Sequence, residues 1–146
     1  MERYTKLTEH RKHRIEQLVT AIRNKYSIGG RPFTEGDFRR ICRGEGIKLA
    51  RHRRYAWYAT FPPLKGLLGC ALTLPNGTRV IWLRSFFEPE INLPTAFHEL
   101  GHALMKHTSE EASYLLAQRD FDGYRDHQQE IEADYFSELA LKGDRK

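Results

Sequence analysis

The residues with the clearest capacity for chemistry are His98, Glu99 and His102, which form the pattern His-Glu-Leu-Gly-His in an apolar stretch. On a helix, four residues advance by about 400° and about 6 Å, so the two histidines project from one face, one turn apart. Two imidazoles at this spacing can bind one metal ion. Glu99 lies beside that face, where its carboxylate could deprotonate a metal-bound water whose pKa zinc lowers to about 7. The pattern predicts a hydrolytic zinc site.

A catalytic zinc ion usually has three protein ligands and one open position, so a third ligand must come from elsewhere in the chain. His107 is nine residues after His98, about 900° around the helix, and therefore on the opposite side from the metal face. The long metzincin motif needs a Gly and a further His where this chain has Met105 and Thr108, which excludes that class. The remaining candidates are His127 and, more promising, the acidic residues Glu130, Glu132 and Asp134 near the end of the chain.

Glu130 and Asp134 are four residues apart and share one face of the last predicted helix. We expect Glu130 to bind the metal and Asp134 to accept a hydrogen bond from the remote ring nitrogen of a ligand histidine, which would fix its tautomer. Glu132 is the alternative ligand. The competing interpretation is that these three acids form a solvated acidic face.

Four helices and a hairpin are predicted around these residues. Apolar residues at helical spacing predict one helix over residues 8–26 and another over 93–107, with Pro94 in its first turn. Thr34 and Asp37 have the spacing of a capping box that opens a short second helix. The last helix is expected to begin at Asp126.

The strand signals are concentrated in the middle of the chain. Two strand-like segments flank Asn76-Gly77, a dipeptide that supplies the positive φ angles of a tight turn, so we expect an antiparallel hairpin over residues 70–84. Residues 47–49 and 55–60 also have strand-like composition.

Composition limits the class of protein. The chain has 146 residues, of which 40% are hydrophobic, and no Ser- or Gly-rich linker, so we expect one domain with a real core. No run approaches the ~20 apolar residues of a membrane span, and residues 1–14 lack the apolar core of a signal peptide. Cys42 and Cys70 cannot form a disulfide framework. A reducing cytoplasm is the expected location.

The net charge of +5 conceals two unlike halves. Residues 1–65 contain 16 Lys or Arg against 6 Asp or Glu, whereas residues 66–146 contain 8 against 13. A basic patch in the first half could bind phosphates or an acidic protein surface, although a solvated face is favoured because no stacking array accompanies the charges. The patch consists of Arg39, Arg40, Arg43, Lys48, Arg51, Arg53 and Arg54.

The run Thr95 to Leu104, together with the later pattern Glu130-x-x-Ala-Asp-x-Phe, resembles the ImmA/IrrE family of metallo-endopeptidases. The resemblance covers roughly residues 34–141. It implies a zincin-like α+β fold with N-terminal helices, a small, mostly antiparallel sheet, the active-site helix and a C-terminal ligand helix. Residues 1–146 would then form one metallopeptidase domain, with residues 1–33 as a helical extension.

The resemblance also implies a reaction and a substrate class. Characterised members are intracellular zinc proteases that cleave helix-turn-helix repressors encoded beside them, so a repressor or a similar regulatory protein is the implied substrate. In related gluzincins the matching Glu is the third ligand and the acid four residues later supports a ligand histidine, which favours Glu130 and Asp134.

A working mechanism follows from these expectations. The substrate would lie antiparallel to an exposed edge strand, for which Arg79 to Arg84 is the candidate. Glu99 would activate the water and pass its proton to the leaving amine. The oxyanion needs a donor besides zinc, and Tyr124, His127 and Tyr135 are equal candidates.

Two other functions remain open on the sequence. The first is a non-catalytic module, stabilised by zinc, that binds nucleic acid or an acidic protein. A structural site does not need Glu99 and usually has a fourth ligand, often Cys, yet Cys42 and Cys70 are far from the motif. The second is a toxin of a toxin and antitoxin pair that uses the same zinc chemistry.

Overall fold

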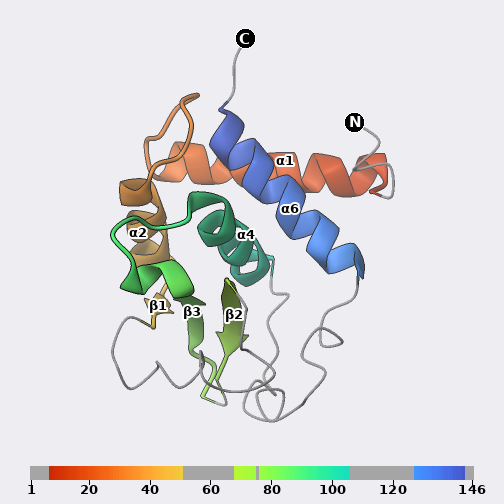
Figure 1. Cartoon of the computed structure of the whole chain (residues 1–146). Coiled ribbons are helices and arrows are strands. Elements are labelled where there is room, and N and C mark those ends of the chain that lie inside the picture. Colours follow the sequence, from red (N-terminus) through yellow and green to blue (C-terminus); the bar gives the residue numbers. More distant parts are fainter. Residues whose placement is uncertain (1–6, 51–67, 75, 106–126, 144–146) are drawn as a thin grey trace.

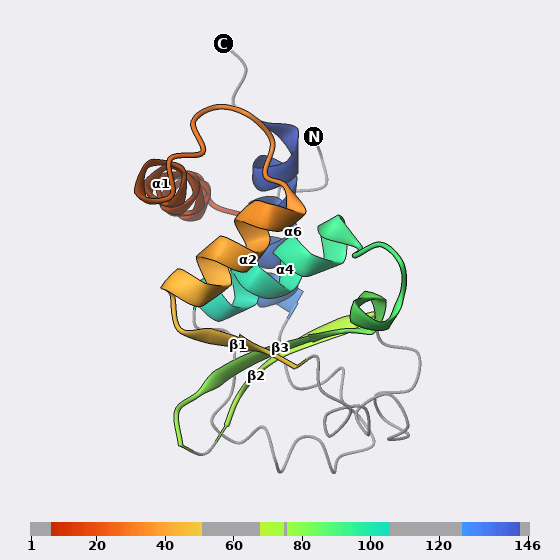
Figure 2. The ribbon, with the colours of Figure 1, turned by 90° about the vertical axis from the view of Figure 1, so that its left-hand side faces the viewer.

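The computed structural model describes residues 7–50, 68–74, 76–105 and 127–143. Within these ranges, four α-helices are stacked over one face of a three-stranded sheet (Figures 1 and 2). The helices α2 (Glu35–Gly44) and α4 (Leu93–Leu104) contact the sheet, α6 (His127–Lys142) packs on α4, and α1 (Glu9–Lys25) packs on α6. The predicted α+β fold is confirmed.

The sheet has the strand order β1-β3-β2 and mixed directions. The strands β2 (Gly69–Thr73) and β3 (Arg79–Leu83) form the predicted antiparallel hairpin, while β1 (Ile47–Leu49) runs parallel to β3. The strand β3 therefore lies between β1 and β2, in the centre of the sheet. The prediction that Arg79 to Arg84 form an exposed edge strand to which the substrate could bind is wrong. The strand expected at residues 55–60 lies outside the described residues.

The hairpin turn differs in detail from the prediction. The positive φ falls on Gly77, at 88°, whereas Asn76 does not have a positive φ. Instead, the Asn76 side chain accepts a hydrogen bond from the Thr78 amide at 3.0 Å. In this turn Gly77 adopts the left-handed backbone conformation, which glycine adopts more freely than other residues. Asn76 contributes a side-chain hydrogen bond that closes the turn.

The helix ends follow the capping signals of the sequence. The Thr8 side chain accepts from the Arg11 amide at the start of α1, and Asn92 accepts from the Thr95 amide at the start of α4. Pro94 occupies the first turn of α4, as predicted. This helix ends at Leu104, and His107 lies outside the described residues. A short 3₁₀ helix, η4 (Arg84–Phe87), follows β3 and was not predicted.

The core lies between the sheet and the helices and is centred on Phe97. Its ring forms edge-to-face contacts with Phe33 and Phe38, at centroid distances of 5.4 and 5.7 Å. All three rings are buried. Edge-to-face pairs are favoured by the aromatic quadrupole, so these contacts fix the rotation of α4. Because Phe97 precedes His98, the same rotation sets the direction of the histidines.

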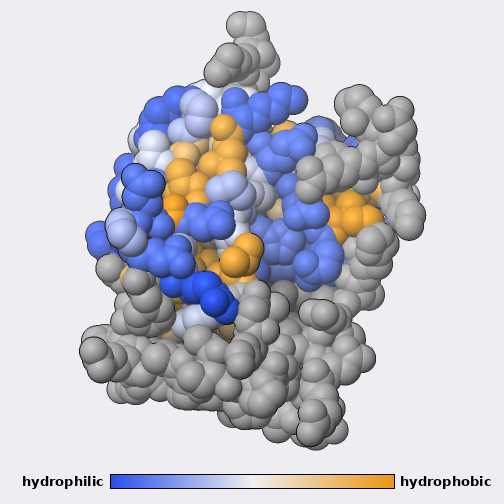
Figure 3. Space-filling model, in the orientation of Figure 1, coloured by the Kyte–Doolittle hydropathy of each residue, from blue (hydrophilic) through white to orange (hydrophobic). Residues whose placement is uncertain are grey.

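The surface is mostly hydrophilic on the face shown in Figure 3, with apolar side chains visible between α2 and α6. Among the described residues, Leu68 is the large hydrophobic side chain with high exposure, at 55%. No helix in the described part of the chain is long and apolar enough to cross a membrane.

The capping box of α2 provides the first testable prediction. Arg31 and Thr34 donate hydrogen bonds to the buried Asp37 carboxylate, and the bond from Arg31 is the main reason that its pKa falls to about 2. At pH values above about 3.9, the pKa of Asp in the unfolded chain, the charged form therefore stabilises the folded state by about 2 kcal/mol. This contribution is lost as the pH falls toward 2. We expect Asp37→Asn to lower the unfolding free energy by about this amount at pH 7.

Urea denaturation of the wild type and Asp37→Asn at pH 7 and near pH 2 tests this prediction. The difference between the two proteins should shrink at the lower pH, because near its pKa of about 2 Asp37 is already about half protonated in the folded state. Glu35→Gln is the matched control, since Glu35 lies in the same turn but is 44% exposed and pairs only with Arg39 among the described contacts. A difference that does not change with pH would contradict the assignment.

Candidate metal centre

Two neighbouring helices bring three possible metal ligands together. His98 and His102 come from α4 and Glu130 from α6, and one ligand atom from each lies within 4.8 Å of the others. The Nε2 atoms of the two histidines are 3.1 Å apart. The Glu130 carboxylate lies 3.0 Å from His98 Nε2 and 3.1 Å from His102 Nε2. Side chains from two helices that are remote in the sequence thus form a compact triangle of ligand atoms.

The dimensions and chemistry of this triangle fit a zinc ion. Zinc binds nitrogen and carboxylate oxygen at about 2.0–2.1 Å, so two ligand atoms of a tetrahedral site are about 3.3 Å apart. The 3.1 Å between the two Nε2 atoms is close to that value, and each Nε2 atom lies 3.0 or 3.1 Å from a different oxygen of the Glu130 carboxylate. Two imidazoles and one carboxylate also form the usual donor set of catalytic zinc, which leaves one position open.

Asp134 occupies the far side of His98. Its Oδ1 atom lies 2.8 Å from His98 Nδ1, while Nε2 of the same ring faces Glu130. Burial lowers the pKa of His98, but the hydrogen bonds to Asp134 and Glu130 outweigh it and raise the pKa to about 10. The carboxylates therefore stabilise positive charge at this ring. An Nδ1 proton shared with Asp134 would direct Nε2 toward a metal.

Glu99 follows His98 on α4 and is only 5% exposed. Its negative charge contributes to the raised pKa of His98, so the carboxylate lies near the histidine pair. The triangle of possible ligands is formed by the other three side chains. Glu99 is thus a buried acid close to the candidate metal ligand His98.

Gly101 allows α6 to approach α4 this closely. A Cβ atom at this position would lie 3.1 Å from Cδ1 and 3.2 Å from Cβ of Phe136, closer than ordinary van der Waals contact. Phe136 is fully buried on α6, and Ser137 of the same helix donates a hydrogen bond to the Pro94 carbonyl at 3.0 Å. The sequence analysis did not identify this role, because the partner of Gly101 is remote in the chain.

Glu132, the alternative ligand, is directed elsewhere. Its side chain is 1% exposed and accepts hydrogen bonds from Arg11 of α1, with Nε at 2.8 Å and Nη2 closer. It is not part of the triangle of possible ligands. The interpretation of all three acids as a solvated face does not hold for Glu132, since it is buried against α1.

Of the three candidates for the oxyanion donor, Tyr135 is the one whose side chain the structure describes, and it is not directed to the candidate metal ligands. Tyr135 donates its hydroxyl hydrogen to Glu16 of α1 at 2.6 Å, so it faces α1 and not the histidines. Burial is the main reason that the pKa of Tyr135 is raised, and the bond to Glu16 adds to it. Tyr124 and the side chain of His127 lie outside the described residues.

One comparison with known proteins finds a match. The family model of the M78 peptidases, described as the IrrE N-terminal-like domain, matches residues 54–144. The matched range includes α4 and α6, the helices that carry the candidate metal ligands. No curated protein and no solved structure matches the chain.

The ion pair between Arg11 and Glu132 provides a second prediction. Removal of the arginine leaves a buried carboxylate without its main counter-charge, which is strongly destabilising. Arg11 is 47% exposed, so we expect Arg11→Met to cost about 2 kcal/mol, less than the roughly 3–5 kcal/mol typical of a fully buried pair. Chemical denaturation followed by circular dichroism measures this change.

Two variants sharpen the measurement. Arg14→Met removes an exposed arginine one turn further along α1 and should change stability by less than about 0.5 kcal/mol. The double variant Arg11→Met, Glu132→Met should recover most of the loss, because an apolar pair replaces both charges. Equal effects of Arg11→Met and Arg14→Met would show that the pair has no special role.

Proposed function

The chain belongs to the IrrE N-terminal-like domain family of peptidases, and from this premise we propose that it is a zinc-dependent endopeptidase that cleaves a regulatory protein. The family is one of metallopeptidases, which supports both the reaction class and a protein substrate. The observation that supports zinc is the close grouping of His98, His102 and Glu130, whose ligand atoms lie within 4.8 Å of one another.

The proposed roles follow from the position of each side chain. A zinc ion held by His98, His102 and Glu130 would act as a Lewis acid and make water nucleophilic near neutral pH. Glu99 would take a proton from the attacking water and deliver it to the leaving amine. Asp134 would hold His98 in the tautomer that presents Nε2, since it lies 2.8 Å from Nδ1.

The proposed substrate is a helix-turn-helix repressor or a related regulator. This follows from the resemblance of the chain to proteases that cleave such repressors, and the family match implies a protein substrate in general. We place the reaction in a reducing cytoplasm, because Cys42 and Cys70 are both buried thiols.

We also propose that residues 1–146 act as one domain, with residues 34–141 as its family-like core and residues 1–33 as a helical extension. The family match begins at residue 54, yet α1 packs against α6 and forms an ion pair with it. An N-terminal helix that covers the back of a ligand helix is part of the same folding unit as the site.

Metal content tests the ligand set. We expect elemental mass spectrometry of the purified protein to find about one zinc per chain. Glu130→Ala should bind much less zinc, because the triangle loses its carboxylate. Glu132→Gln is the matched control: it alters an acid of the same helix that faces Arg11, and it should retain zinc. No zinc in the wild type after incubation with an excess would exclude the proposed site.

Glu99→Gln tests the chemistry separately from metal binding. The amide keeps the size of the side chain but cannot accept the proton, so we expect peptidase activity to fall by about 10²–10⁴-fold while zinc content stays normal. Incubation of a cell extract with each protein, followed by mass spectrometry of newly formed N-termini, would measure cleavage of whichever protein in the extract is the substrate. Full activity in zinc-loaded Glu99→Gln would overturn this role.

A further inference from the structure

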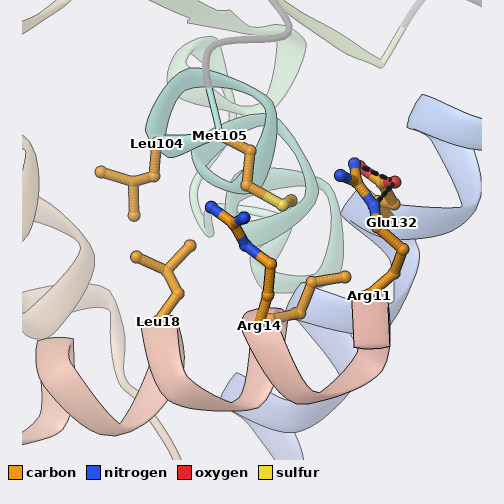
Figure 4. Close-up of a pocket in the computed structure, with 7 residues that line it drawn as sticks. Arg11, Arg14, Leu18, Leu104, Met105 and Glu132 are labelled. Atoms are coloured by element: carbon orange, nitrogen blue, oxygen red, sulfur yellow. Dashed lines mark hydrogen bonds and ion pairs between the residues drawn. The ribbon is translucent and has the colours of Figure 1, made fainter. Parts of the chain in front are cut away.

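A second site lies where α1, α4 and α6 meet (Figure 4). It is a pocket of about 400 Å³, within the range of about 300–1,000 Å³ that small-molecule sites occupy. Leu18 of α1 and Leu104 and Met105 at the end of α4 form its apolar wall. None of these residues belongs to the candidate metal centre, so the pocket is a separate feature.

The polar side of the pocket has an excess of positive charge. Arg11, Arg14 and Glu132 line it, and Arg11 pairs with the buried Glu132 carboxylate. Arg14 lies one turn further along α1, and its guanidinium points in among the apolar side chains beside Met105 (Figure 4). Within the described residues it forms no hydrogen bond or ion pair. The pocket therefore offers one cation that has no ion-pair partner among the described residues, next to an apolar wall.

We propose that this pocket binds a small amphipathic carboxylate. A single carboxylate matches the one uncompensated charge, and it can accept two parallel hydrogen bonds from a guanidinium. A short aliphatic chain on the ligand would pack on Leu18, Leu104 and Met105 and remove their apolar surface from water. The arginines disfavour a cationic ligand. The proposal does not depend on the peptidase function, because no proposed zinc ligand or proton acceptor lines the pocket.

The chain offers a direct reporter of occupancy. It contains two methionines, Met1 and Met105, so protein labelled with ¹³C at the methionine methyl groups gives two signals, and Met105→Leu identifies which one comes from the pocket. Octanoate, below its micelle concentration, is the probe. We expect a saturable shift of the Met105 signal and no comparable shift of the Met1 signal.

Charge and chain controls decide the interpretation. Octylammonium has the same chain with the opposite charge, and acetate has the charge without the chain, so both should bind at least about 10-fold more weakly than octanoate. Arg14→Gln should weaken octanoate binding by at least about 10-fold, because the ligand loses its charged partner. Arg43→Gln, which changes an exposed arginine of α2, should leave it unaltered. No saturable Met105 shift, equal shifts of both methionines, or undiminished binding in Arg14→Gln would each overturn the proposal.

Discussion

The close approach of α4 and α6 is the contact on which the candidate metal centre depends. The histidines come from one helix and the carboxylates of Glu130 and Asp134 from the other, so the triangle of ligand atoms exists only while the helices remain in contact. Gly101 permits this approach, because any side chain there would press on the buried Phe136 ring. The glycine lies inside the metal-binding pattern itself. The spacing of that pattern therefore serves two purposes: it aligns two imidazoles and leaves room for the helix that carries Glu130, the candidate third ligand.

The opposite side of α6 is held by α1. Arg11 pairs with Glu132, Glu16 accepts a hydrogen bond from Tyr135, and Arg23 donates to the Leu139 carbonyl at 3.2 Å. These contacts follow one another along both helices, so α1 restrains α6 from Glu132 to Leu139. Residues of α6 that face α4 supply the candidate metal group, and residues that face α1 supply its support. A helix with charged residues on two buried faces needs a specific partner for the charges on each face. The reason is that a buried charge without a partner costs folding free energy.

Local chemistry explains which features the sequence predicted. The histidine spacing, the capping box of Thr34 and Asp37, and the hairpin about Gly77 each involve residues less than about one turn or one loop apart, and all three are present. The features that the sequence predicted wrongly or left open involve remote partners. The position of β3 in the centre of the sheet depends on β1, and the direction of Glu132 depends on Arg11, 121 residues away. The face of α6 that carries Glu130, a candidate metal ligand, and the face that carries Glu132, the partner of Arg11, are both acidic. Composition alone could therefore not separate them.

The charge of the site argues further for a divalent cation. Glu99, Glu130 and Asp134 surround two imidazoles, and Glu99 is buried, so water screens its charge poorly. With neutral imidazoles the group would hold three negative charges. One proton on His98, whose pKa is raised to about 10, offsets only one of them. A divalent ion offsets two and also satisfies both Nε2 atoms, which otherwise face each other at 3.1 Å. The same carboxylates that favour a proton on His98 would also attract a divalent cation, because two packed helices hold them close to the histidines.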